Sequence, residues 1–93
     1  MPDVITPLVH LNGTSRDELL SQREAAYLAV NAAREAICQM APSGRDYYPV
    51  EGLYSKAIEH HRQRLGALNA IAEGIMAECE ILSEAQPQNG TRQ

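Results

Sequence analysis

The feature that most limits what this chain can fold into is an unbroken heptad of apolar positions in its second half. From residue 54 to residue 82 the steps alternate between four and three, giving the series Tyr54, Ile58, His61, Leu65, Leu68, Ala72, Ile75, Cys79 and Leu82. A period of about 3.5 residues is typical of an α-helix that packs against another helix along one seam. A β-strand has a period of two, so the pattern predicts a helix over about residues 51–83.

A helix is also predicted over about residues 15–41. Ser15 and Glu18 have the spacing of a capping box, in which the hydroxyl accepts from the Glu18 amide and the carboxylate bonds back. Pro42 disfavours helical backbone at Ala41, so the helix is expected to end there. The expected apolar stripe is Leu19, Ala26, Val30, Ala33, Ile37 and Met40, with Arg23 as its polar member and a second row at Leu20, Tyr27 and Leu28.

The connection over residues 42–50 is short, which makes the two helices antiparallel neighbours. Counting outward from it places Ile37 near Ile58, Val30 near Leu65 and Leu19 near Ile75. The longer second helix would then extend past the start of the first.

Charge favours the same arrangement. The second helix carries acids at its C-terminal end, where the helix dipole disfavours them: Glu73, Glu78, Glu80 and Glu84. Antiparallel packing would set these acids beside Arg16, Arg23 and the positive start of the first helix.

The predicted fold is therefore all-α, an antiparallel two-helix hairpin. We expect residues 1–14 to form an extended N-terminal arm, residues 15–83 the hairpin domain and residues 84–93 a disordered tail. With 93 residues, no Phe and no Trp, the core of one copy is thin. Self-association into a dimer or a higher helical bundle, such as a four-helix bundle, is the expected remedy.

Composition argues against several classes of function. The net charge of −4 does not favour duplex nucleic acid as a partner, and no apolar run approaches the roughly 18 residues that cross a membrane. The N-terminus lacks the features of a secretory signal, so we expect the cytoplasm, where Cys38 and Cys79 would be buried reduced thiols. No catalytic or metal-binding pattern stands out, so neither an enzyme nor a cofactor is predicted.

The connection holds the most distinctive candidate binding residues. Arg45 offers a planar fork for phosphate or carboxylate, and Tyr47 and Tyr48 offer rings on which a base can stack. Asp46 can orient Arg45 or accept from a ligand. The alternative is purely structural: Arg45 pairs with Asp46, and the tyrosines fill the open end of the hairpin.

Two further sets of candidates extend this prediction. His61, on the apolar seam, and Arg64 belong to a basic segment next to the connection; His61 either contacts a ligand or forms an inter-helix hydrogen bond. Asn12, Thr14 and Ser15 can hold an anion at the helix start, or can simply cap it after an Asn-Gly turn. These residues lie a helix length from the connection, so only another copy of the chain could bring both sets into one composite site.

The order HLNGTS, helix, GRDYYP and EHHRQRL resembles a group of short bacteriophage and prophage reading frames, over roughly residues 10–82. The resemblance implies a phage origin. Several small helical phage proteins oligomerise and sequester the cyclic nucleotide signals of bacterial immunity. By that analogy the chain is expected to be a counter-defence sponge for an anionic, nucleotide-like small molecule. The alternative is a phage structural or assembly component, or an inhibitor of a host protein, that acts through protein contacts only.

Overall fold

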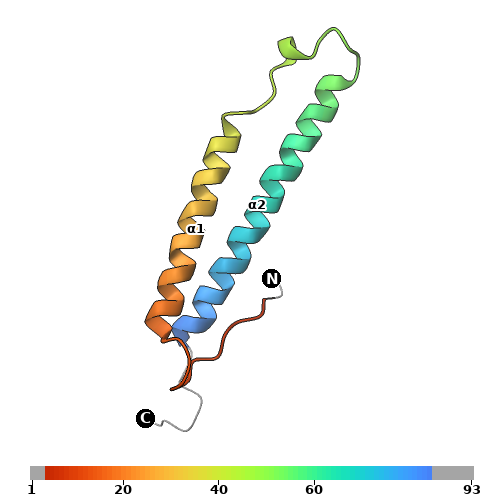
Figure 1. Cartoon of the computed structure of the whole chain (residues 1–93). Helices are drawn as coiled ribbons and strands as arrows, with labels where there is room; N and C mark the ends of the chain where they lie inside the picture. Colours follow the sequence, from red (N-terminus) through yellow and green to blue (C-terminus); the bar gives the residue numbers. More distant parts are fainter. Residues whose placement is uncertain (1–3, 85–93) are drawn as a thin grey trace.

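A computed structural model describes residues 4–84 and confirms the helical hairpin. Helix α1 spans Arg16–Cys38 and helix α2 spans Leu53–Glu84, and between them lies one 3₁₀ turn, η1, at Gly44–Asp46. The two helices run antiparallel, side by side, and residues 4–84 contain no strand (Figure 1). Neither helix is long and apolar enough to cross a membrane. The predicted tail lies outside the described residues, except that Glu84 closes α2.

The helix ends differ slightly from the predicted ones. Ser15 caps α1 as expected, its hydroxyl accepting from the Glu18 amide at 3.1 Å. However, α1 ends at Cys38, before the predicted Ala41, because the chain tightens there. The amides of Gln39 and Met40 donate to carbonyls three residues back, at 3.2 and 2.9 Å, and a turn of this kind ends a helix. At the other side of the connection, α2 follows Gly52, whose φ of 82° favours glycine.

The predicted register between the helices is wrong by one heptad. Arg23 donates from Nε to Oε1 of Glu78 at 2.8 Å, and Arg34 donates from Nη1 to Oδ1 of Asn69 at 2.6 Å. Leu19 belongs to one cluster with Leu82, whereas the prediction placed it level with Ile75. The surplus length of α2 therefore lies at the connection end, beyond the end of α1 (Figure 1).

The seam of α2 is confirmed, but that of α1 is rotated. From Ile58 to Leu82 every predicted seam position of α2 is buried or half-buried; Tyr54, beyond α1, is exposed. On α1, Leu19 is buried, and Val30 and Ile37 are half-buried, as predicted. The other three predicted members of the stripe are exposed: Ala26, Ala33 and Met40. Arg23, the predicted polar member, is half-buried, as are Leu20 and Tyr27 from the predicted second row. Arg34, which was not predicted, is half-buried too.

Residues 4–14 pack along the far end of the hairpin without forming a helix or a strand. Val9 joins Leu19 and Leu82 in a buried cluster, in which Leu82 has no exposed surface. Val4 lies over Gly74, where a Cβ on the glycine would be 3.7 Å from the Val4 side chain. Gly74 therefore lets the N-terminal segment approach the backbone of α2 closely.

The core of the described chain is thin. Its buried hydrophobic residues are Val9, Leu19, Ala72, Ala77 and Leu82. Large apolar side chains remain exposed along the whole molecule, among them Ile5, Leu28 and Tyr48. This imbalance agrees with the predicted need for self-association, which stays a prediction.

Leu82→Ala should lower the stability of the hairpin strongly, because it empties a fully buried site at the one cluster that joins both helices and the N-terminal segment. Truncation of a buried leucine costs roughly 2–5 kcal/mol, which for a chain of this size lowers the melting temperature by on the order of 10 °C or more. Ile81→Ala, at a half-exposed neighbour, is the control. Equal losses in thermal unfolding would contradict the assigned core.

Candidate functional site

The predicted site residues lie in two groups at opposite ends of a molecule 67 Å long. The group at the connection end consists of Arg45, Asp46, Tyr47, Tyr48, His61 and Arg64. The group at the other end consists of Asn12, Thr14 and Ser15. Figure 1 shows the connection at one end of the hairpin and the segment that enters α1 at the other. One copy of the chain therefore does not bring the two groups together.

The two adjacent tyrosines of the connection have different environments. Tyr47 is half-buried, and its ring lies 6.3 Å from that of Tyr54, centroid to centroid, at an angle of 35°. Its amide donates to the carbonyl of Gly44 at 3.1 Å. Tyr48, by contrast, is 80% exposed. Tyr47 thus fills the end of the hairpin, as the structural alternative proposed, while Tyr48 presents its ring to solvent.

The side chains of Arg45 and Asp46 are both exposed in the 3₁₀ turn. The structural alternative predicted that they pair with each other. No ion pair joins these two residues, whereas Arg23 and Glu78 form one between the helices. The Arg45 side chain is therefore exposed to solvent, as is the ring of Tyr48 three residues later.

His61 lies on α2 just beyond the end of α1, and Arg64 lies level with that end. His61 is half-buried on the seam, but it forms no hydrogen bond with another described residue, so the predicted inter-helix hydrogen bond is absent there. The register explains this, because α1 has already ended at that level. Arg64 is exposed.

The group at the other end forms an ordinary capped turn. The Gly13 amide donates to the His10 carbonyl at 3.2 Å, and the His10 ring covers Gly13 so closely that a Cβ there would be 2.7 Å from Nε2. The Ser15 hydroxyl is engaged in capping α1. Asn12 and Thr14 are exposed, so their polar groups face solvent.

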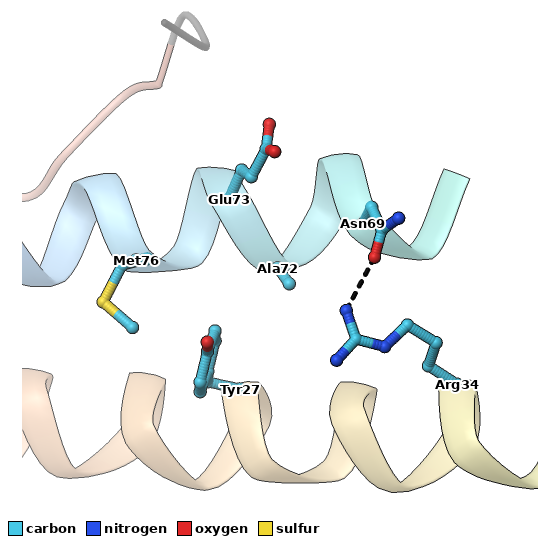
Figure 2. A pocket seen from close by; sticks show the side chains of 6 residues that line it. All are labelled: Tyr27, Arg34, Asn69, Ala72, Glu73 and Met76. Atoms are coloured by element: carbon cyan, nitrogen blue, oxygen red, sulfur yellow. Dashed lines mark hydrogen bonds between the residues drawn. The ribbon is translucent and has the colours of Figure 1, made fainter. Parts of the chain in front are cut away.

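Sequence reasoning missed a groove between α1 and α2, on one face of the hairpin. Its first cavity, of about 190 Å³, is lined by Tyr27, Arg34, Asn69, Ala72, Glu73 and Met76. Figure 2 shows the Arg34–Asn69 hydrogen bond crossing it, with Tyr27 and Met76 pointing toward one another and Glu73 pointing away from α1. The second cavity, of about 300 Å³, shares Tyr27 and Met76 and adds Glu24, Leu28 and Cys79. We call this pair of cavities the inter-helix groove.

The signal for this groove was present in the sequence. Leu20, Arg23, Tyr27, Val30, Arg34 and Ile37 also alternate steps of three and four. The predicted stripe and its second row contain every member of this series except Arg34. An arginine on such a seam indicates either a partner across the seam or an opening to solvent.

The two free thiols differ in environment. Cys38 is exposed, which contradicts the prediction that both cysteines are buried. Cys79 lies half-buried in the inter-helix groove. Burial raises the pKa of the Cys79 thiol, and the negative charge of Glu24 raises it further.

No protein-family model, curated protein or solved structure shows significant similarity to this chain. The function is therefore argued from the residues and their geometry.

Cys38 should be alkylated by iodoacetamide several times faster than Cys79 at pH 7.5. The thiolate is the reacting form, and a raised pKa leaves less of it at Cys79, which is also less accessible. Peptide mass spectrometry over time measures both rates, and in concentrated urea they should converge. Faster modification of Cys79 in the folded protein would contradict the assigned burial.

Proposed function

We propose that this chain is a non-enzymatic binding protein that captures an anionic, nucleotide-like small molecule at the connection between its helices. The proposal depends on two solvent-exposed side chains in this connection, those of Arg45 and Tyr48. Tyr48 is 80% exposed, and Arg45, three residues before it, has an exposed side chain with no ion pair. A ring that stacks on a base and a guanidinium that holds a phosphate are the two contacts such a ligand requires.

Tyr47, the half-buried neighbour of Tyr48 in the sequence, supports this role. Its contact with Tyr54 anchors the turn that carries Arg45 and Tyr48. An anchored turn loses less conformational entropy when a ligand binds, so more of the interaction energy appears as affinity.

Charge along α2 favours the same end of the molecule. Its connection-proximal part exposes the basic side chains Lys56, His60, Arg62 and Arg64. The distal part carries the acids that include Glu73, Glu78 and Glu80. This separation draws an anion toward the connection, at long range in low salt.

The proposed protein acts as an oligomer in the cytoplasm of a host bacterium. Asn12 and Thr14 can complete the site only from another copy, because they lie at the opposite end of their own chain. The layout that resembles short phage reading frames supports a counter-defence role, in which the protein sequesters a cyclic nucleotide immune signal. Sequestration requires tight binding and no turnover.

Cyclic dinucleotides and cyclic trinucleotides should raise the melting temperature of the purified protein. Ligand at a hundred times its Kd adds about 2.7 kcal/mol of stability, equivalent to a shift of on the order of 10 °C for a chain of this size. Arg45→Ala and Tyr48→Ala should each remove most of the shift. Arg62→Ala, which removes an equal charge from an exposed position outside the proposed contacts, should keep most of it.

The absence of any shift across a broad nucleotide panel would refute the ligand proposal. A retained shift in both Arg45→Ala and Tyr48→Ala would place the ligand elsewhere. Tyr48→Phe separates the two roles of the phenol, because it keeps the stacking ring and removes the hydroxyl.

A second candidate function, contact with another protein, rests on exposed apolar side chains at the same end. Met40 is 59% exposed, Val50 57% and Leu53 40%. A patch of this kind is typical of an interaction surface. In this case a host or phage protein, and no nucleotide, would bind, and Val50→Asp with Leu53→Asp would abolish that binding while Arg45→Ala would leave it nearly unchanged.

A further inference from the structure

The inter-helix groove has no role in the proposed ligand site. It lies between the helices along their distal part, away from Arg45 and Tyr48. Leu28, which lines it, is 67% exposed, and Met76 is 38% exposed. Residues 4–14 leave these two side chains exposed. Val4 packs over Gly74, which lies about 200° around α2 from Met76 at about 100° per residue.

We propose that a second copy of this chain packs into the inter-helix groove, antiparallel to the first, about a two-fold axis near Leu28 and Met76. Such an interface is isologous, so one face must carry both members of every contact pair. The inter-helix groove meets this condition. Its apolar centre has a cation on one side and a carboxylate on the other.

The spacing of the two charges fits the two-fold axis. Arg34 lies six residues from Leu28 toward the connection, about 9 Å at the helical rise, and Glu24 lies four residues from it in the other direction, about 6 Å. An antiparallel partner reverses these positions. Along the helix axis, Glu24 of the second copy then lies about 3 Å from the level of Arg34 in the first copy. A long arginine side chain can span this difference.

Arg34 also lacks a carboxylate partner among the described residues. Its one side-chain hydrogen bond goes to the neutral amide of Asn69, at a solvent-exposed position. Glu73, the acid in the same cavity, points away from α1 (Figure 2). A carboxylate from a second copy would supply the counter-ion that Arg34 lacks among the described residues of one copy.

The face is also large enough. The hairpin is 67 Å long and 20 Å wide, and a stable interface needs roughly 800 Å² from each partner. Burying Leu28 and Met76 would add to a core that is thin in one copy. The proposal concerns assembly alone and does not depend on the identity of any ligand.

Mixing two charge-reversed variants of the full chain tests the proposal. Arg34→Glu and Glu24→Arg should each weaken self-association by about tenfold or more in sedimentation equilibrium, because each homodimer then places like charges together. In an equimolar mixture both contacts join opposite charges again. The mixture should therefore associate nearly as tightly as the wild type, with a heterodimer visible in native mass spectrometry.

Two controls accompany the mixing experiment. Glu59→Arg reverses an exposed charge outside the inter-helix groove and should have little effect on association. Far-UV circular dichroism verifies that each variant remains helical.

The proposal is overturned by any of three results: a wild-type chain that stays monomeric at tens of micromolar, a mixture no tighter than the separate variants, or a folded Leu28→Arg variant that associates like the wild type. Leu28 is largely exposed in one copy, so its replacement tests the interface and not the fold.

Discussion

The whole arrangement depends on how α1 and α2 are held in one register. The seam offers few large apolar side chains, so polar contacts have unusual weight in fixing it. Arg23 joins Glu78 and Arg34 joins Asn69, each across the two helices. These contacts set the level at which α1 ends, and hence how far α2 extends beyond it. The connection that carries Arg45 and Tyr48 lies at the end of this extension, so its position is a consequence of contacts made far from it.

The hairpin itself was predictable, because a heptad and a capping serine are local signals. The register was not. Shifting α2 by one heptad leaves the same positions facing α1, so the periodicity is equally well satisfied by Leu19 beside Ile75 or beside Leu82. What decides between them is pairwise chemistry and the true length of the connection. The latter was underestimated because the chain leaves the α-helix at Cys38, before the proline that signals a stop.

The candidate site, too, was predictable from the sequence only in part. The residue types of the connection predicted an anionic ligand with a flat ring. The sequence does not show, however, that two adjacent tyrosines have different environments. The 3₁₀ turn separates them: Tyr47 meets Tyr54, a residue predicted to lie on the seam, and Tyr48 is left in solvent. The inter-helix groove was not predicted because the expected stripe of α1 lacked Arg34, which lines the groove together with Tyr27.

The extension of α2 beyond α1 also has a dynamic consequence. A helix paired along its length opens only when the pair separates, whereas a projecting turn can fray alone. Backbone amides between Leu53 and His61 are therefore governed by small, frequent openings, restrained chiefly by the connection that folds against them. We therefore expect the connection end to open more readily than the paired region, and a ligand at the proposed site would stiffen it without altering that region.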